Sequence, residues 1–187
     1  MSSERSPGRP RDESAAPALK AAARRLVNAR GYPKVSVSEL IREAGVSRQS
    51  LYRRWPTKAD LVLEAFLEVA PSPEPEDEVD SRAALLTLLE AIFDHLAQDG
   101  AAIRSLIASA QEDPQFLATF REGFLIPREA FITRVLERAK AEGALPQTAD
   151  LEILLTMVSG AFWYRLLNGQ ALDRAFARGL VAGVFGW

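Results

Sequence analysis

The chain has 187 residues, of which 48% are hydrophobic, and its formal net charge is −2, so it can bury a sizeable core. It contains no cysteine and a single histidine, His95, which excludes disulfides and thiolate catalysis and argues against a zinc site or a Ser-His-Asp triad. No apolar run reaches the roughly 18 residues of a membrane span. The first residues also lack the apolar core of a signal peptide. We therefore expect a cytoplasmic protein with no membrane partner, no cofactor and no enzymatic activity.

The charge is divided unevenly between the two ends of the chain. Residues 1–70 contain 13 Lys and Arg against 8 Asp and Glu, whereas residues 71–187 contain 10 against 17. A basic end on an acidic remainder suits a protein that brings only one end to nucleic acid. Chance clustering would give the same numbers, so the asymmetry only supports a motif that is found independently.

The first 13 residues, MSSERSPGRPRDE, are rich in Ser, Pro and charge and are predicted to be a disordered basic arm. Within it, Gly8-Arg9-Pro10-Arg11 resembles the hooks with which Arg enters a narrow minor groove. The simpler alternative, which we favour, is a solvated tail that adds only non-specific affinity for DNA.

A first helix is predicted from Ser14 or Pro17 to about Arg30, because apolar residues recur there at helical spacing. Gly31 ends it, and Tyr32-Pro33 forms a stiff connection. Lys34 follows and is a candidate phosphate contact.

Residues 36–58, SVSELIREAGVSRQSLYRRWPTK, predict two short helices around a tight turn. Ser36 with Glu39 is a capping-box pattern, Gly45 is a helix stop, and Ser47 is a good N-cap for the second helix. Only Leu51 anchors this second helix inward. The rest of its surface is basic, amide, hydroxyl and phenol, which suits a duplex groove better than a protein core. The pattern predicts a helix-turn-helix with the second helix as the reader.

The residues that follow, LYRRWPTKADLVLEAF, resemble the signature of the TetR family of one-component bacterial repressors. An aromatic pair, Tyr52 and Trp55, brackets the end of the reading helix, and Lys58 opens the next, apolar helix. The resemblance is close over about the first third of the chain and architectural beyond it. It implies a homodimer that binds a palindromic double-stranded DNA operator, most simply a repressor that a small hydrophobic effector releases.

We expect Trp55 to pack beneath the reading helix, and the exposed polar side chains around it to contact bases or phosphates rather than only solvent. Lys58, at the N-terminus of the fourth helix, lies beside free backbone N–H groups that favour phosphate. The predicted DNA contacts are Lys34, Ser36, Ser47, Arg48, Gln49, Ser50, Tyr52, Arg53 and Lys58.

Beyond the fourth helix, the Pro-rich acidic segment PSPEPEDEVD forbids helix and predicts a linker. The chain is then helical from Ser81 to about Gln98, is broken by Gly100, and resumes as a shorter helix from about 103 to 110. Asp113-Pro114 starts another helix, which Pro127 is expected to kink or split. Asp150 caps a helix that ends at Leu167, and a last helix is predicted from Leu172 to Phe185.

The predicted fold is therefore all-α: an N-terminal three-helix DNA-binding domain, joined by a fourth helix to a larger helical body for ligand binding and dimerisation. The predicted parts are an arm (1–13), a helix-turn-helix domain (14–57), a connecting helix (58–70), a linker (71–80) and an effector-binding and dimerisation domain (81–187).

The resemblance implies an apolar effector cavity between helices of the body, which aromatic residues on facing helices would line. By that analogy the candidates are Phe93, Phe116, Phe120, Phe124, Phe131, Phe162 and Trp163. The same aromatics more often form plain core. We interpret His95 as a structural histidine with satisfied hydrogen bonds, and no convincing metal-binding set is present.

A dimer interface is predicted in two segments, residues 151–167 and 171–187. The first segment is apolar beyond a single stripe, and the second carries small residues that let helices approach closely. The predicted interface residues are Leu154, Val158, Phe162, Leu172, Phe176, Leu180 and Val184. Two other classes of function remain open: a helical enzyme or carrier that uses the aromatic body, and a helical adaptor whose basic surface binds an acidic protein.

Overall fold

The computed structural model describes residues 14–68 and 80–186, and in those ranges the chain forms helices and no strand. This confirms the predicted all-α class. The predicted arm (1–13) and residues 71–79 of the predicted linker lie outside the described residues. Within the described part, no helix is both long enough and apolar enough to cross a bilayer.

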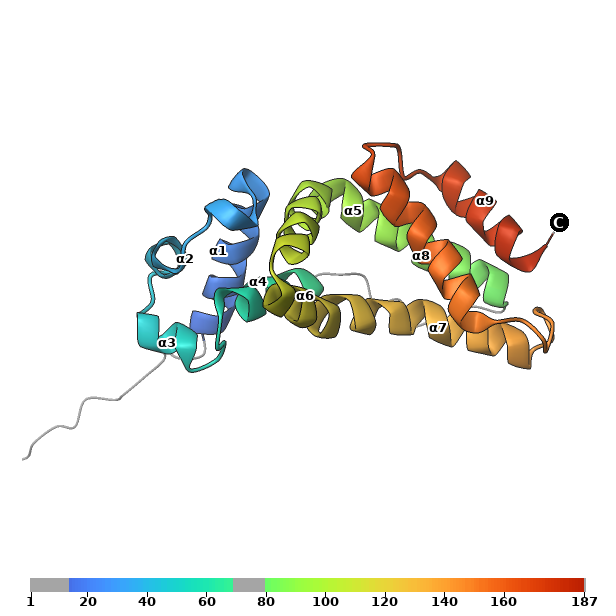
Figure 1. Cartoon of the computed structure of the whole chain (residues 1–187), viewed down its shortest axis with the longest axis horizontal. Helices are drawn as coiled ribbons and strands as arrows, with labels where there is room; N and C mark the ends of the chain where they lie inside the picture. The colour runs from blue at the N-terminus through green and yellow to red at the C-terminus, as the bar shows by residue number, and fades with distance from the viewer. Residues whose placement is uncertain (1–13, 69–79, 187) are drawn as a thin grey trace, which may run out of the picture.

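Four helices and a 3₁₀ turn form one end of the molecule, which we call the head (Figure 1). Their apolar faces meet in a small core around Leu19, Leu40, Leu51 and Phe66, all fully buried. The elements are α1 (Ala15–Arg30), η1 (Tyr32–Lys34), α2 (Val37–Ala44), α3 (Arg48–Tyr52) and α4 (Lys58–Leu67).

The helix ends of the head follow the predicted capping chemistry. Ser36 and Glu39 form a complete capping box at the start of α2, and Gly45 ends that helix in the left-handed conformation, with φ 64° and ψ 31°. At the start of α3, the Ser47 hydroxyl accepts a hydrogen bond from the Ser50 N–H. Local sequence thus determines the turn that positions α3 against α2.

The remaining helices form the body, in which α5 and α7 run along the long axis and α8 and α9 cover its outer end (Figure 1). Its elements are α5 (Ser81–Glu112), α6 (Pro114–Phe120), the π-helical segment η3 (Arg121–Leu125), α7 (Ile126–Ala141), α8 (Leu151–Leu167) and α9 (Arg174–Phe185). Asp150 caps α8 as predicted, whereas the last helix starts at Arg174 with Asp173 as its cap, two residues later than predicted.

The predicted break at Gly100 is wrong, because α5 continues through it to Glu112. A Cβ atom placed on Gly100 would lie 3.0 Å from Leu166 Cδ1 on α8. Glycine is therefore used here for close approach of two helices, and packing outweighs its helix-weakening tendency, which costs about 1 kcal/mol.

The interruption predicted at Pro127 takes the form of the π-helical segment that directly precedes it. Proline has no N–H to donate to the helical ladder, and π segments accommodate such a defect without ending the helix. The aromatic side chains of α6, η3 and α7 therefore stay on one continuous helical path.

The head is fastened to the body by a polar clamp, which we define as Arg24, Asn28 and Asp99. The Asp99 carboxylate on α5 is 2% exposed, and it accepts hydrogen bonds from Arg24 Nη2 at 2.8 Å and from Asn28 Nδ2 at 2.7 Å on α1. Beside the clamp, the Tyr32 ring stacks on Phe116 of α6 with 4.6 Å between ring centroids. Tyr32 therefore packs at the joint between head and body.

Candidate DNA-binding surface and effector pocket

The outer face of α3 carries the predicted reading residues. Leu51 is fully buried and fixes the helix, while Arg48, Gln49, Tyr52 and Arg53 are exposed, Tyr52 to 44%. Arg48 Nη2 donates to Ser38 Oγ on α2 at 3.1 Å, which holds the guanidinium beside the turn. The segment from Gly45 to Lys58 contains no carboxylate, so the surface that α3 presents is cationic and rich in hydrogen-bond donors.

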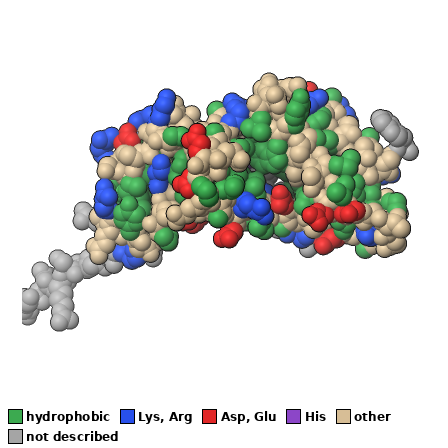
Figure 2. Space-filling view, in the orientation of Figure 1, with side chains coloured by type: hydrophobic (Ala, Val, Ile, Leu, Met, Phe, Trp, Pro, Cys, Tyr) green, Lys and Arg blue, Asp and Glu red, His purple; other side chains and the backbone are tan. Residues whose placement is uncertain are grey.

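Four of the five carboxylates among the described residues of the head are bound to its own cations, and the fifth, Asp60, caps α4 at Thr57. Arg30 pairs with Glu39 at 2.6 Å, Arg25 pairs with Glu43, and Lys20 pairs with both Glu64 and Glu68. Figure 2 shows Lys and Arg side chains across the visible face of the head, whereas a row of Asp and Glu lies towards the far end of the body. The field of the molecule therefore favours approach of DNA to the head.

Lys58 differs from the other predicted DNA contacts because its ammonium group is turned inward. Nζ donates to the carbonyl oxygens of Tyr32 at 3.1 Å and of Val35 at 2.9 Å, and it lies 3.8 Å from the centroid of the Tyr32 ring. Burial lowers the pKa of Lys58 below its ordinary value. In this structure Lys58 ties α4 to η1, and only its remaining N–H is available to a phosphate.

Trp55 packs beneath α3 as predicted. Its side chain is 3% exposed, and its indole Nε1 donates to Glu64 Oε2 on α4 at 2.7 Å. Lys34 and Ser36 lie just before α2, and Ser47 lies just before α3; all three are exposed. Ser50, on α3, is half-buried. With the exception of Lys58, the predicted contacts therefore remain accessible to DNA.

A cavity lies in the body between α5, α7 and α8, with about 600 Å³ of space that includes part of the open solvent. Its walls are mostly apolar, with Leu88 and Ile92 on α5 and Ile132 on α7. We call it the effector pocket. Four of the seven predicted ligand-site residues line it: Phe124, Phe131, Phe162 and Trp163.

The other three predicted ligand-site residues lie outside the pocket, because their rings pack elsewhere. Phe116 stacks on Tyr32 at the joint with the head, and Phe120 packs between Phe116 and Phe124. Phe93 stacks on Phe176 of α9 with 5.7 Å between ring centroids. Helical spacing alone does not distinguish these core rings from the rings of the pocket wall.

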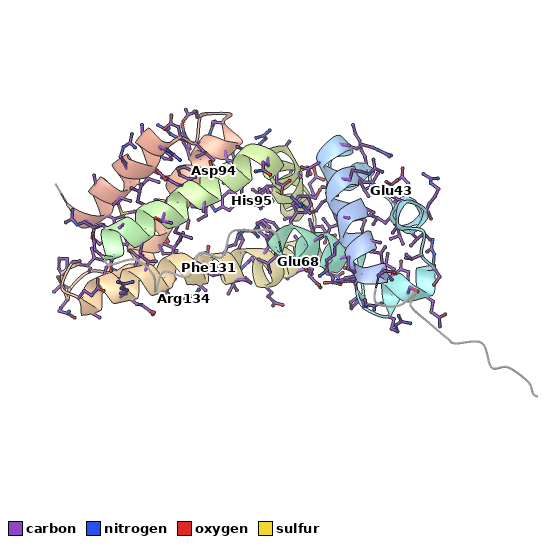
Figure 3. The ribbon with its side chains drawn as sticks, turned by 180° about the vertical axis from the view of Figure 1, so that it is seen from behind. Glu43, Glu68, Asp94, His95, Phe131 and Arg134 are labelled. Atoms are coloured by element: carbon purple, nitrogen blue, oxygen red, sulfur yellow. The ribbon has the colours of Figure 1, made fainter. Side chains whose placement is uncertain are left out.

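His95 lines the pocket and also makes the internal contacts expected of a structural histidine. Its Nδ1 lies 3.7 Å from Asp99 Oδ2, and its Nε2 lies 3.5 Å from Arg128 Nη2. Burial, reinforced by the positive charge of Arg128, holds the pKa of His95 below its usual value. The neutral ring can accept from Arg128 at Nε2 while its Nδ1–H faces Asp99. Figure 3 shows His95 on α5 and Phe131 on α7, facing the space between the two helices.

Three further polar residues of the pocket, Arg128, Glu129 and Ser159, were missed by sequence reasoning. Arg128 occupies the apolar face of its helix, four residues after Phe124 and three before Phe131, and this position was the available signal. Among the described residues, no group of three or more His, Cys, Asp or Glu side chains lies close enough together to hold a metal ion.

The outer face of α8 is apolar and exposed. Ile153, Met157, Tyr164 and Leu167 are 51–63% exposed and recur at helical spacing, with Gly160 in the middle; we call this set the α8 stripe. On the neighbouring α9, small residues such as Ala175, Gly179 and Gly183 are exposed.

The α8 stripe is the opposite face from the one predicted to dimerise. Val158 and Phe162 are 1% and 5% exposed, because they are buried inside the subunit against α5 and α7. The other predicted interface residues, Leu154, Leu172, Phe176, Leu180 and Val184, are half-buried. On α8 the prediction chose positions that face the core of the subunit, since both faces of that helix are apolar.

Comparison with known proteins gives a consistent result for both parts of the chain. A family model described as "Bacterial regulatory proteins, tetR family" matches residues 19–65, and one described as "Tetracyclin repressor-like, C-terminal domain" matches residues 75–184.

Individual relatives match along nearly the whole chain. The HTH-type transcriptional regulator YdeS of Bacillus subtilis is 30% identical over 183 residues, which is 95% of this chain and 91% of that protein. The DNA-binding transcriptional repressor TetR of Mycobacteroides abscessus is 28% identical over 93% of each chain. The crystal structure of the TetR-family transcription regulator SCO0332 superposes with a TM-score of 0.75 at 29% identity, covering 92% of this chain and 97% of that one.

Proposed function

Because the chain belongs to the TetR family and is therefore a transcriptional regulator rather than an enzyme, we propose that it acts as a cytoplasmic repressor. In this proposal a homodimer binds a palindromic operator through two copies of α3, and a small apolar effector bound in the body releases it. The repressor role is supported by the similar M. abscessus protein, whose name states that activity.

The observation that carries the proposal is the outer face of α3. It presents Arg48, Gln49 and Tyr52 on a helix held by Leu51, with no carboxylate between Gly45 and Lys58. Arg and Gln near the start of a reading helix suit base edges in the major groove, and Tyr and Lys suit phosphates. Lys34, Ser36, Ser47, Ser50 and Arg53 complete the proposed DNA contacts, with Lys58 in a mainly positioning role.

The α8 stripe supports the homodimer. Four large apolar side chains exposed in one row are unusual on the surface of a protein that functions as a single chain. A two-fold interface made by α8 and α9 of each subunit would cover them in a four-helix bundle. It would also hold two heads at the spacing of about 34–36 Å that successive major-groove faces require.

Control by an effector is supported by the positions of the pocket and the clamp. The pocket wall includes His95, which faces Asp99, and Asp99 binds α1 of the head. A ligand that binds one arrangement of this wall more tightly than another shifts the equilibrium between two positions of the head. The size of the shift is limited by the difference between its two affinities.

Selection of bound fragments from a random pool of double-stranded DNA tests the proposal directly. We expect enrichment of one inverted repeat whose half-site centres lie about 10 base pairs, or a multiple of one helical turn, apart. The matched control is Arg48→Ala combined with Gln49→Ala, which should enrich no sequence although the head remains folded.

Two results would contradict the proposal. If a monomer enriches single half-sites, the protein does not bind its operator as a homodimer. If the well-folded wild-type protein enriches no sequence, it does not recognise an operator. In the second case, binding to an acidic protein would become the better explanation of the α3 surface.

A further inference from the structure

The effector pocket contains a buried cation that no carboxylate of the described residues contacts directly. The Arg128 guanidinium lies 3.6 Å from the centroid of the Phe124 ring, and its Nη2 donates to the Phe66 carbonyl oxygen at 3.1 Å. Its Nη1 is buried and has no hydrogen-bond partner among the described residues. A buried guanidinium without an anion is costly, since it loses hydration and gains only neutral acceptors.

The carboxylates nearest to Arg128 do not serve as its partner. Asp99 is already bound by Arg24 and Asn28 of the head. Glu129 lines the same pocket, but no carboxylate of the described residues lies within ion-pair distance of Arg128. Burial lowers the pKa of Arg128 to about 10, against the opposing influence of the Asp99 charge, so the group is still charged at neutral pH. Its charge is therefore available to an anion that enters the pocket.

Ser159 supplies a second unsatisfied group to the same cavity. Its side chain on α8 is 7% exposed, and Oγ is buried with no hydrogen-bond partner among the described residues. Around Arg128 and Ser159 the wall is apolar and aromatic, with Ile92, Phe131 and Trp163 among its members. The pocket thus combines an apolar interior with a guanidinium and a hydroxyl.

We propose that the effector is an apolar carboxylic acid, whose carboxylate binds Arg128 Nη1 and Ser159 Oγ while its hydrocarbon part fills the aromatic cavity. A carboxylate satisfies both donors at once, and its bonds to guanidinium are among the stronger ones in proteins. An apolar alcohol or hydrocarbon of the same shape would leave the guanidinium unpaired. This inference rests on the proposed function, since it names the chemistry of the ligand in that pocket.

Arg128 also supplies the route from ligand to head. The Phe66 carbonyl belongs to the last turn of α4, where carbonyl oxygens lack helical partners, so Arg128 acts as a C-terminal cap on a helix of the head. A carboxylate that draws the guanidinium into the pocket weakens this cap and the contact with His95. Ligand binding therefore loosens the attachment of α4 to the body, and α3 follows.

The test compares two probes of equal chain length, decanoate and decanol, by isothermal titration calorimetry on the full-length protein. We expect wild type to bind decanoate, and to bind decanol about tenfold to a hundredfold more weakly. Arg128→Gln should bring decanoate affinity down to that of decanol. Ser159→Ala should weaken decanoate several-fold and leave decanol unchanged.

Arg121→Gln is the matched control, because Arg121 lies on the adjoining η3, is exposed and does not line the pocket. It should leave both affinities unchanged. Glu129→Gln should strengthen decanoate binding, since it removes a like charge from the wall. Equal affinity for the two probes, binding of neither probe, or equal losses in Arg128→Gln and Arg121→Gln would overturn the inference.

Operator affinity, measured by fluorescence anisotropy on the selected inverted repeat, separates this inference from the proposed function. Decanoate should weaken operator binding by wild type, and Ser159→Ala should need more decanoate for the same effect. A protein that binds its operator but ignores decanoate refutes the carboxylate inference alone. A protein that binds decanoate but no DNA refutes the proposed function and leaves the pocket chemistry standing.

Discussion

The head and the body satisfy their side chains in different ways. In the head, the carboxylates of Glu39, Glu43 and Glu64 pair with cations of the same domain, and both capping boxes are complete. Among the described residues, buried polar side-chain atoms without partners occur at Arg128 and Ser159 of the body and at Arg24 Nε in the joint between head and body. The α8 stripe of the body also leaves large apolar side chains in solvent.

This difference indicates where each part meets other molecules. In the head these carboxylates are paired internally, and the outer face of α3 remains as the cationic surface that we propose binds DNA. The body has two sets of groups whose requirements one subunit does not meet, and each set implies a particular kind of partner. Buried donors imply an anion in the pocket, and an exposed apolar row implies a second subunit.

The largest expected effect follows from placing a charge in the α8 stripe. Met157→Asp, at a position 58% exposed in the subunit, should convert the dimer to a monomer, because an unpaired carboxylate would be buried at the interface. Operator affinity should fall by orders of magnitude, since one head reads only one half-site. Analytical ultracentrifugation and anisotropy on the same samples measure both changes.

Ile126→Asp provides the control for this substitution. Ile126 is 50% exposed but lies on α7, outside the α8 stripe. This variant should remain a dimer with unchanged operator affinity. If Met157→Asp also sediments as a dimer, the interface lies elsewhere on the body.

A smaller but sequence-specific loss is expected from α3. Arg48→Ala or Gln49→Ala should cost about 1–3 kcal/mol on the best operator and less on random DNA, because each removes a base contact. Arg134→Ala, an exposed arginine of the body, should cost nothing on either DNA. Equal losses on operator and random DNA would mean that Arg48 and Gln49 touch only phosphates.

Two lysines of the head, Lys34 and Lys58, allow the effects of an exposed and an inward-facing charge to be compared. Lys34 is exposed, so Lys34→Ala should flatten the salt dependence of operator binding by about one unit per half-site without changing stability. Lys58 donates to two backbone carbonyls, so Lys58→Ala should destabilise the head by about 1–3 kcal/mol.

Chemical denaturation together with salt titration of anisotropy separates the two lysines. If Lys58→Ala leaves the denaturation midpoint unchanged and flattens the salt slope, then Lys58 releases its internal contacts when DNA binds. It would then be a phosphate contact, as the sequence suggested.

Structural features that depend only on a short stretch of sequence could be predicted. The capping box at Ser36, the left-handed turn at Gly45 and the cap at Asp150 each depend on a few neighbouring residues. The stop expected at Gly100 failed for the opposite reason. Whether a helical glycine ends or continues a helix depends on its partner, here Leu166, which is 66 residues away.

In the candidate site, too, the features that depend on neighbouring residues could be predicted, and those that depend on distant helices could not. The polar surface of α3 could be predicted because one short helix carries it. The choice between core and pocket for each phenylalanine could not, since it depends on which of several helices faces the ring: Phe116 meets the head and Phe131 meets the cavity. Arg128 shows that one charged residue in an apolar stripe can indicate a site better than the aromatic residues around it.

The smallest effect expected is a pH dependence of stability at His95. Burial and the charges of Arg128 and Arg24 hold its pKa below the ordinary 6.5, against the opposing influence of Asp99. On acidification the unfolded chain therefore takes up a proton before the folded protein does. His95 has no effect on stability well above pH 6.5, and below it stability falls by at most about 1.4 kcal/mol per pH unit.

His95→Gln should remove this contribution, because glutamine stays neutral and can still accept a hydrogen bond from Arg128. The measurement is the free energy of unfolding in urea at about pH 7.5 and about pH 5.5 for both proteins; the titration of the carboxylates is common to both and cancels. Wild type should lose more stability between the two conditions than the variant does. Equal losses would mean that His95 takes up its proton as readily in the folded protein as in the unfolded chain. Burial and the positive charge of Arg128 would then not be enough to keep the ring neutral in the folded protein, against the opposing influence of Asp99.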